Sequence, residues 1–563
     1  MLKVSGLFSF LLRIIREAEV SKATAGLIVG ASLLGGAASA ALIGVINSAV
    51  HRTAPESRLL WIFVGLCAAL PLLRFTSSYL LLRMTQDALL KLRLHLCRLS
   101  LVAPLRELER IGTSRMMPAI TEDLSTLGGF IGSIPLLVMQ AAVVVGCIVY
   151  VGTLSWVLLL VLIAFVLLGV VTYQLPAMRA QKYFRGAREV WDRLFAHLRG
   201  ITDGAKELKI HHARRKAFFE EQLQPDFRRL RDNSLAGQAL HTAAGGWGQV
   251  LFFILIGVLL FGFSGKVDER TLTGFTLAIL FIRTPLDSLL TMIPTVARAS
   301  IAAEKIQALD RELDATALPA EMHPPAPIPS WSTLELRSAA HTYRGESDDE
   351  FILGPLDLTL RPGELVFLIG GNGSGKTTLA KLLIGLYKPE QGEILLDGQR
   401  ITDDNRDAYR QLFSVVFSDF YLFDSLLGLT DPQIDVQALH YLARLELDRN
   451  VRVRNGVLST LKLSQGQRKR LALLTAYLED RPIYVFDEWA ADQDPRFKRI
   501  FYEELLPELR QRGKTVIVIS HDDHYYHVAE RFIKLSSGRL EYDGNASWPL
   551  AEAQSVAPAV GAE

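Results

Sequence analysis

The residues most able to do chemistry form a glycine-rich loop, GGNGSGKT, at positions 370–377. An apolar run at 364–369 precedes it and suits a buried parallel strand, and a helical run at 378–386 follows it. The glycines let backbone N–H groups wrap a polyphosphate at a helix N-terminus, where the peptide dipoles favour negative charge. The pattern predicts a phosphate-binding loop, in which Lys376 contacts the β- and γ-phosphates and Thr377 offers its hydroxyl to Mg²⁺. The predicted ATP-binding residues of this segment are Gly370, Gly371, Asn372, Gly373, Ser374, Gly375, Lys376, Thr377 and Thr378.

Two acidic residues, Asp487 and Glu488, follow a second buried-strand pattern at 483–486. At the carboxyl end of a strand beside the phosphate loop, Asp487 can hold the Mg²⁺ shell while Glu488 polarises the water that attacks the γ-phosphate. A third strand pattern, at 515–519, leads to His521, whose imidazole can contact the γ-phosphate. The sequence therefore predicts Glu488, His521 and Lys376 as catalytic residues, and Thr377 and Asp487 as Mg²⁺ ligands.

These motifs lie in a C-terminal domain that we expect to span 331–545, followed by a disordered tail at 546–563. A Pro-rich linker at 313–330 separates this domain from the preceding part of the chain, because its prolines break the helical pattern. The alternation of buried strands and helices predicts an α/β P-loop NTPase fold.

The preceding part, 23–312, contains stretches long enough to cross a hydrocarbon layer of about 30 Å, which takes about 20 helical residues. We expect six spans, at 23–50, 59–82, 131–151, 154–173, 245–263 and 272–293. The third and fourth form a tight hairpin, and the first is rich in Gly and Ala, so neighbouring helices can approach it closely. The predicted architecture is an α-helical six-span transmembrane domain fused to the P-loop domain.

Charge fixes the orientation of these spans. The two long loops are basic, with seven Lys and Arg at 83–115 and fourteen at 179–231. By the positive-inside rule, both long loops and the P-loop domain lie in the cytoplasm, and the first 22 residues form an amphipathic segment at the inner surface. The formal charge of +2 is thus a cancellation between −6 over 331–545 and +8 over the remainder.

Composition excludes other classes. Hydrophobic residues make up 50% of the 563, and the charged share of 21% is below the common value of about 25%, which excludes a disordered or purely nucleic-acid-binding chain. We expect no nucleic-acid partner, since the basic runs suit solvated cytoplasmic helices. Three well-separated cysteines indicate neither a disulfide framework nor a thiolate metal site, and we expect them to be buried apolar residues: Cys67, Cys97 and Cys147.

Between these strands lies LSQGQ, at 463–467, which resembles the LSGGQ signature of the ATP-binding cassette family. Six spans followed by one cassette is similar to the layout of exporter-type half-transporters of that family. The resemblance implies that the signature of one cassette closes over ATP held by another, and hence a homodimer that works by alternating access with ATP and Mg²⁺. It also implies roles for Tyr343 in stacking on adenine, for Asp494 as the D-loop aspartate, for His521 as the switch histidine, and for the signature residues Ser464, Gln465, Gly466 and Gln467.

The cassette departs from the family pattern where most members have a Q-loop glutamine, because Ser418 stands there with Asp419 beside it. Either residue is a candidate to complete the Mg²⁺ and water shell.

The segments VVFSDFYLFD, LSQGQRKRLALL, DEWAADQDP and ISHDDHYY together resemble the branch of cyclic-peptide exporters, which handle siderophore precursors, lipopeptides or microcins. The resemblance implies ATP-driven export of a cyclic or modified peptide across a bacterial cytoplasmic membrane. Alternatives are a lipid or multidrug exporter, a siderophore importer, and a cassette ATPase without a transport role.

Ionisable residues within the spans are candidate substrate contacts, since charge in a membrane is costly and usually faces a cavity or a partner. Arg283 and Asp287 are four residues apart on one helix face, and the pair favours mutual neutralisation. Arg74 lies toward the cytoplasmic half of its span, where its side chain can extend to the head groups. For both sites we favour the structural role over substrate contact.

Overall fold

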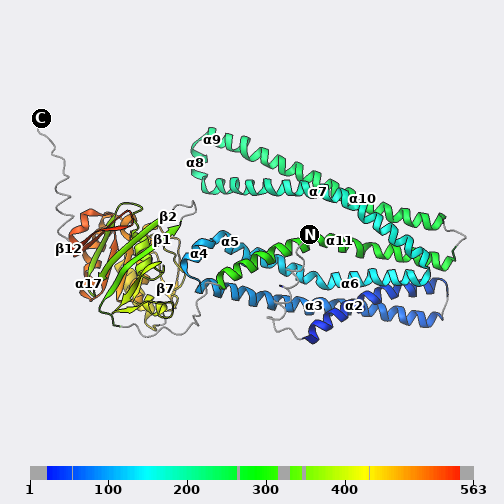
Figure 1. Cartoon of the computed structure of the whole chain (residues 1–563), viewed down its shortest axis with the longest axis horizontal. Coiled ribbons are helices and arrows are strands. Elements are labelled where there is room, and N and C mark those ends of the chain that lie inside the picture. Colours follow the sequence, from blue (N-terminus) through cyan, green and yellow to red (C-terminus); the bar gives the residue numbers. More distant parts are fainter. Residues whose placement is uncertain are drawn as a thin grey trace. The chain divides into compact units, whose positions relative to one another are not determined.

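The computed structural model describes residue 10 and residues 22–52, 55–262, 267–314, 330–344, 350–429 and 431–545. The chain divides into two compact units, one mainly of long helices and one built around β-sheets (Figure 1). Residues 1–97 and 116–309 form the membrane unit, and residues 98–115 with 310–563 form the cassette unit. The predicted amphipathic segment lies almost entirely outside the described residues, as do most of the Pro-rich linker and the C-terminal tail.

Six helices of the described chain are long and apolar enough to cross a membrane, which confirms the predicted six-span architecture. They are α2 (Lys22–Val50), α3 (Glu56–Val102), α6 (Leu124–Leu154), α7 (Trp156–Asp203), α10 (Gln224–Gly262) and α11 (Glu269–Asp314). At 1.5 Å per residue, the 47 residues of α3 reach about 70 Å, more than twice the hydrocarbon thickness. Helix α3 therefore continues well beyond the bilayer.

Short elements complete the two long loops. They are α4 (Leu105–Ile111), α5 (Thr113–Pro118) and η1 (Ala119–Asp123) in the first, and α8 (Ala205–Ile210), α9 (His212–Ala217) and η2 (Phe218–Leu223) in the second. The predicted hairpin between the third and fourth spans turns at a single residue, Ser155, whose hydroxyl accepts a hydrogen bond from the backbone N–H of Leu158 at 3.5 Å and caps α7.

Small residues bring α2 and α6 together. A Cβ built on Gly36 would come within 2.3 Å of the Ala142 Cβ, and one on Gly146 within 2.5 Å of the Ala40 Cβ. The two backbones can lie this close only because glycine has no side chain, as the composition of the first span indicated.

The cysteine expectation was wrong for two of the three. Cys147 is buried in the membrane unit, whereas Cys67 and Cys97 are exposed on the single chain. Both lie on α3, a helix with apolar residues on its exposed faces as well as its packed ones, so apolar character alone does not identify its buried side.

Two sheets organise the cassette. The first is antiparallel, with strand order β2-β1-β4-β5, and the second has the order β12-β11-β3-β10-β9-β6. In the second sheet all neighbouring pairs are parallel except β11 with β12. The strands are β1 (Leu334–Arg344), β2 (Glu350–Leu360), β3 (Leu365–Gly370), β4 (Gln391–Leu396), β5 (Gln399–Arg400), β6 (Phe413–Val416), β7 (Val453–Arg454), β8 (Val457–Leu458), β9 (Ile483–Asp487), β10 (Thr515–Ile519), β11 (Arg531–Ser536) and β12 (Arg539–Asn545).

The helices of the cassette are α12 (Lys376–Leu383), α13 (Arg406–Arg410), α14 (Ile434–Arg444), α15 (Gln465–Glu479), α16 (Pro495–Arg499) and α17 (Leu506–Gln511), with the short turns η3 (Trp489–Asp492), η4 (Ile500–Leu505) and η5 (Asp523–Val528). Strands β9 and β10 are fully buried, and an apolar cluster lies on each face of the sheet. The predicted P-loop fold class is confirmed, and the carboxyl ends of β3, β9 and β10 meet at one edge.

Candidate functional site

The phosphate loop connects the end of β3 to the start of α12, as its sequence predicted. Gly370 ends the strand with φ 147°, and a Cβ there would meet the Leu535 carbonyl oxygen at 2.3 Å, so a residue with a side chain does not fit. Within the loop, the hydroxyl of Ser374 is buried and has no hydrogen-bond partner in the described part of the chain. A buried hydroxyl without a partner is costly, and a phosphate oxygen would satisfy it.

Lys376 is buried at the start of α12, and its Nζ donates to the carbonyl oxygens of Gly370 at 3.0 Å and Gly371 at 2.9 Å. Desolvation by burial lowers the pKa of Lys376, while the nearby charges of Glu488 and Asp487 act in the opposite direction. The ammonium group is thus held against the loop on which a polyphosphate would lie.

Two hydroxyl groups converge on the carboxylate of Asp487, the last residue of β9. The hydroxyl of Thr377 donates to Asp487 Oδ2 at 3.1 Å, and the hydroxyl of Ser418 donates to the same oxygen at 3.3 Å. Burial raises the pKa of Asp487, and its hydrogen bond from Thr377 opposes this rise. A cluster of hard oxygen atoms at a phosphate loop suits Mg²⁺, so these residues fit the predicted metal.

The same geometry distinguishes the two candidates at the Q-loop position. Strands β6 and β9 pair in parallel, with Val416 opposite Phe486, which brings the residue two positions after Val416 beside Asp487. That residue is Ser418, which bonds to Asp487, whereas the side chain of Asp419 is exposed.

Glu488 and His521 lie next to each other at the carboxyl ends of β9 and β10. His521 Nε2 is 3.2 Å from Glu488 Oε1, and both side chains are partly exposed. The register that places Ile519 opposite Asp487 brings the two residues together. Glu488 has a φ of 49°, a left-handed conformation that is uncommon for a residue with a side chain and is concentrated at functional sites.

Lys469 is a residue of this site that sequence reasoning missed. Although only 3% exposed, it extends from α15 to donate to the carbonyl oxygen of Glu488 at 2.9 Å, and it pairs with Asp492 at 2.8 Å. The indole N–H of Trp489 donates to the Lys469 carbonyl oxygen at 2.7 Å. These contacts fasten α15 to the strained turn at Glu488. The only sequence signal was a Lys within RKR after the LSQGQ segment, a pattern typical of a solvated helix.

The signature segment forms the N-terminus of α15. Ser464 caps the helix by accepting from the N–H of Gln467, whose side chain accepts from the N–H of Ser464 in return. Gln465 is exposed, and Gly466 lies against the Asp492 carbonyl, where a Cβ would come within 3.1 Å. Asp494 caps α16 and pairs with Arg470 at 2.6 Å. The predicted signature and D-loop residues therefore lie side by side.

Tyr343 lies in the four-stranded sheet, whereas the carboxylates Asp487 and Glu488 lie at the end of a strand of the six-stranded sheet. It is partly exposed near the end of β1 and pairs with Phe351 of β2, whose ring would be 3.0 Å from a Cβ on Gly375. Phe351 thus links Tyr343 to the phosphate loop, and the exposed tyrosine ring offers a flat face for stacking.

Helix α4 belongs to the cassette unit and is held there by polar contacts. Glu109 accepts from Lys381 Nζ at 3.0 Å and from the Tyr387 hydroxyl at 2.7 Å, and Arg106 donates to Glu390 at 2.7 Å. Because Lys381 lies on α12, which begins at the phosphate loop, these bonds connect the first cytoplasmic loop to the nucleotide site.

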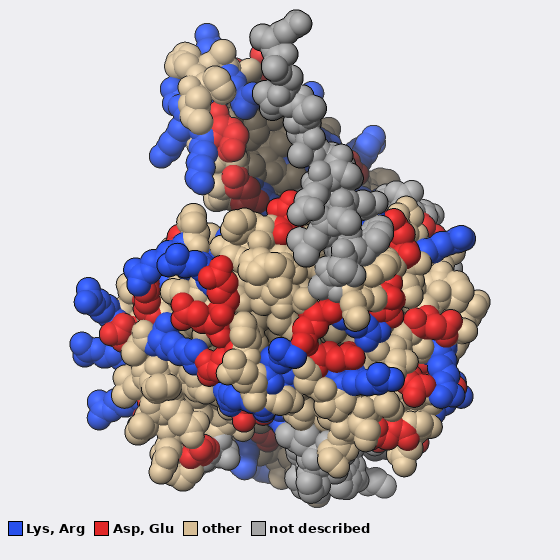
Figure 2. All heavy atoms as spheres, turned by 90° about the vertical axis from the view of Figure 1, so that its left-hand side faces the viewer, with Lys and Arg blue, Asp and Glu red and all other residues tan. Residues whose placement is uncertain are grey.

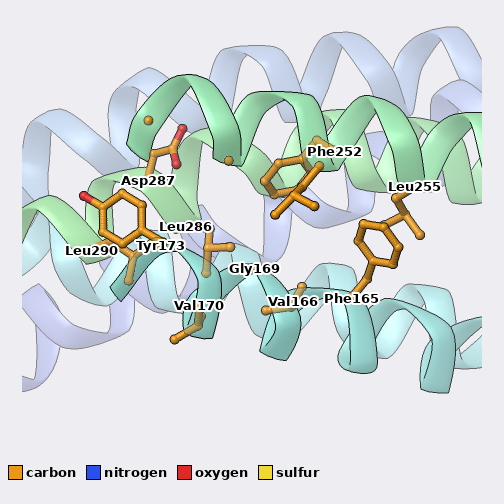
Figure 3. A pocket seen from close by; sticks show the side chains of 13 residues that line it. Phe165, Val166, Gly169, Val170, Tyr173, Phe252, Leu255, Leu286, Asp287 and Leu290 are labelled. Carbon is orange, nitrogen blue, oxygen red and sulfur yellow. The ribbon is translucent and has the colours of Figure 1, made fainter. Parts of the chain in front are cut away.

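Within the membrane unit, an apolar pocket of about 60 Å³ is lined by α7, α10 and α11 (Figure 3). Phe165, Val166 and Phe252 contribute to its wall, with Tyr173 and Asp287 at one end. Asp287 pairs with Arg283 at 3.9 Å, the mutual neutralisation that the four-residue spacing predicted.

Both halves of the chain match known family models. Residues 353–491 match the model described as ABC transporter, and residues 26–285 match the ABC transporter transmembrane region. The chain is 38% identical over 530 residues to the ATP-binding protein SyrD of Pseudomonas syringae pv. syringae, covering 91% of this chain and 92% of that protein. It is 27% identical over 521 residues to an ATP-dependent lipid A-core flippase of Dechloromonas aromatica, covering 87% and 86%. Among solved structures, a bacterial Atm1-family ABC exporter with ATP bound superposes with a TM-score of 0.71 at 20% identity, covering 97% of this chain and 100% of that one.

Proposed function

Because this chain belongs to the ABC transporter family, with the six-span domain and single ATP-hydrolysing cassette of an exporter-type half-transporter, we propose that it exports a cyclic or modified peptide across the bacterial cytoplasmic membrane. It is a multi-pass membrane protein whose cassette binds ATP in the cytoplasm. We propose four properties: a peptide substrate, transport out of the cell, location in the bacterial cytoplasmic membrane, and a dimer of two identical chains.

The observation that carries the peptide assignment is that the segments resembling the cyclic-peptide exporters meet at one site. The segments that resemble the cyclic-peptide exporters are those that supply Ser418, Lys469 and Asp492. Ser418 bonds to Asp487, and Lys469 joins Asp492 to the backbone of Glu488. The segments that carry the resemblance are thus connected parts of one site. The similarity to SyrD over most of both chains supports the same branch.

In the proposed mechanism, Glu488 orients and polarises the water that attacks the γ-phosphate, and His521 holds the Glu488 carboxylate in place from 3.2 Å away. Lys376 neutralises charge on the β- and γ-phosphates. Thr377 and Asp487, with Ser418, would hold Mg²⁺, which supplies charge neutralisation on the phosphate oxygens.

Assembly of two chains completes the site in this proposal. Ser464 and Gln465 at the start of α15 are exposed on the single chain, so they are available to a nucleotide held by a second copy. A helix N-terminus presents free N–H groups that favour an anion such as the γ-phosphate. The contacts of α4 with α12 then transmit closure of the cassettes to the membrane helices.

The test is deletion of the gene followed by mass spectrometry of secreted and cell-retained peptides. We expect one cyclic or modified peptide to disappear from the medium and accumulate inside the cell, and restoration by the wild-type chain but not by Glu488→Gln. An unchanged peptide profile would refute the peptide assignment. Uptake into inside-out vesicles, compared with right-side-out vesicles, distinguishes export from import.

Lipid export is the second candidate, favoured by the similarity to a lipid A-core flippase and by the apolar pocket along α7. An accumulated lipid in place of a peptide in the deletion strain, together with ATPase stimulation by lipid and not by peptide, would support it.

A further inference from the structure

We propose that a second cavity in the membrane unit binds an anionic oxygen group, a carboxylate or phosphate, of the transported molecule through Arg74. This inference rests on the proposed transport function and adds to it the chemical group that the membrane unit recognises. The cavity lies between α2, α3 and α6 and has a volume of about 210 Å³.

The wall of this cavity is mixed, with polar side chains beside the apolar Pro135, Leu136 and Met139, whereas the pocket along α7 is mainly apolar. Arg74 lines it together with four hydroxyl groups, those of Ser32, Ser77, Ser78 and Ser133. Polar side chains within spans almost always face the interior of the bundle or a water-filled path and not the lipid. Gly132 also lines the cavity, and a Cβ there would meet nothing within 4 Å, so the space beside it is open.

Arg74 has no acidic partner in the described part of the chain. Neither an ion pair nor a hydrogen bond involves its guanidinium there, whereas the other arginine of the spans, Arg283, has Asp287. A charge within a membrane span costs free energy. An arginine cannot avoid this cost by losing its proton, since its pKa lies far above physiological pH. Arg74 is exposed on the single chain, so its charge is compensated by a group outside the described chain, either a ligand in the cavity or the head groups that its side chain can reach.

Among the described residues, one serine hydroxyl of the cavity is left to donate to an anion, because the other three already give their single protons to neighbouring oxygens. The hydroxyls of Ser32 and Ser77 lie 2.6 Å apart and bond to the Ile28 carbonyl oxygen, and the hydroxyl of Ser133 donates to the Phe130 carbonyl oxygen at 2.7 Å. Over the described ranges, no carboxylate lines the cavity to compete for the guanidinium. Ser78 follows Arg74 by one helical turn, and its hydroxyl is without a partner among the described residues, so it is free to donate to the same anion.

The depth of Arg74 suits a group that loads from the cytoplasm. With α3 beginning at Glu56, Arg74 lies about 27 Å along the helix, near the inner end of a hydrocarbon layer of about 30 Å. The planar guanidinium binds two oxygens of a carboxylate or phosphate at once. Two sources can supply that group, the transported molecule or a phospholipid head group. We assign it to the transported molecule because residues of three different helices, α2, α3 and α6, line the cavity.

The first experiment measures the charge of the cavity without any transport. In full-length protein with the exposed Cys67 and Cys97 replaced by Ser, Ser78→Cys is labelled with an anionic and a cationic methanethiosulfonate reagent. We expect the anionic reagent to react about tenfold faster, relative to the cationic one, with Arg74 present than in Arg74→Gln, which corresponds to one nearby charge. Arg58→Gln, on the same helix but outside the cavity, is the control and should leave the ratio unchanged. A Ser78→Cys variant that neither reagent labels, or a ratio that does not depend on Arg74, overturns the proposal.

The second experiment identifies the source of the anion. The reconstituted ATPase is titrated with an N-dodecanoyl tetrapeptide that has a free C-terminal carboxylate, and with its C-terminal amide. We expect the acid to act at about tenfold lower concentration than the amide, a preference that Arg74→Gln removes and Arg74→Lys partly keeps. Equal preference in wild type and Arg74→Gln overturns the proposal.

Lipid is varied in the same assay, with phosphatidylcholine membranes compared with membranes containing phosphatidylglycerol. If Arg74→Gln abolishes only the response to phosphatidylglycerol, the arginine binds a lipid head group and the assignment to the transported molecule is wrong. If neither peptide stimulates the wild-type enzyme, the proposed peptide substrate fails, while the labelling ratio still decides whether the cavity is cationic.

Discussion

Asp487 in the cassette and Arg74 in the membrane unit are both charged groups in costly surroundings, yet within the described chain only Asp487 has partners. Asp487 is completely buried and accepts hydrogen bonds from Thr377 and Ser418, and Lys376, Glu488 and Lys469 also have partners nearby. Arg74 lines a cavity to which the described residues contribute hydroxyl groups but no carboxylate. The difference teaches that the cassette supplies partners for its charged groups from its own residues, whereas in our proposal the membrane unit leaves the charge of Arg74 to a ligand.

One face of the molecule carries both signs of charge. On the face shown in Figure 2, Lys and Arg side chains alternate with Asp and Glu over the described residues. Mixed signs do not build the strong single-sign field that attracts a polyanion such as nucleic acid.

The largest effect that tests this comparison is expected from Glu488→Gln. The substitution keeps the shape of the side chain but removes the carboxylate next to His521, so steady-state ATP hydrolysis should fall by about a hundredfold or more while ATP binding remains. Phosphate release and nucleotide titration measure the two quantities separately. Glu503→Gln, at an exposed glutamate on η4, is the control and should hydrolyse ATP as the wild type does. Wild-type turnover in Glu488→Gln would contradict the catalytic role of Glu488.

Lys376→Ala should weaken nucleotide binding by about tenfold to a hundredfold, because it removes a charged hydrogen-bond donor from the phosphate loop. Titration with a fluorescent ATP analogue measures the change, and Lys462→Ala, at an exposed lysine before the signature, should bind as wild type does. Unaltered affinity in Lys376→Ala would show that the backbone of the loop alone determines binding.

Ser418→Ala tests whether this residue acts where most family members have glutamine. Because the hydroxyl bonds to Asp487, its loss should raise the Mg²⁺ concentration for half-maximal ATPase by about tenfold, the lower limit for a residue that orients a metal ligand. Asp419→Ala should leave the Mg²⁺ dependence unchanged, since that side chain is exposed. If Asp419→Ala changed the Mg²⁺ dependence and Ser418→Ala did not, Asp419 would be the residue that takes the place of the Q-loop glutamine.

The smallest effect is expected from Arg283→Ala. Its partner Asp287 lies 3.9 Å away on the same span, so the two charges neutralise each other and need no ligand, and substrate-stimulated ATPase per folded molecule should stay within about twofold of wild type. A loss of stimulation well beyond twofold in Arg283→Ala would contradict this contrast between the two arginines, and it would give the pocket along α7 a role in substrate binding.

The sequence predicted most reliably those parts of the site that depend on residues adjacent in the chain. The loop at 370–377 could be recognised because a strand, a turn and a helix follow one another directly in the sequence. The acids after β9 could be recognised because they directly follow a buried-strand pattern. The contact of Ser418 with Asp487 depends on the register of β6 against β9, and these residues are 69 positions apart. Sequence therefore named two candidates at the Q-loop and could not choose between them.

The sequence also could not predict which way side chains point from a helix. The buried Lys469 lies in a charged run that is typical of an exposed helix, and only the packing of α15 shows that it reaches the backbone of Glu488. In the membrane spans most faces are apolar, so composition could identify α3 as a span but not which of its sides faces Ser32. The exposed Cys67 and Cys97 were missed for the same reason.

ATP-dependent transport in reconstituted vesicles tests the central claim most directly. Purified full-length protein is inserted into liposomes, and entry of a dye-labelled cyclic lipopeptide is measured for molecules with the cassette outside. We predict that ATP drives accumulation in the lumen by the wild-type chain and not by Glu488→Gln, with the unlabelled lipopeptide as competitor. Active ATP hydrolysis without accumulation of the peptide, under conditions in which a labelled lipid is moved, would contradict the account.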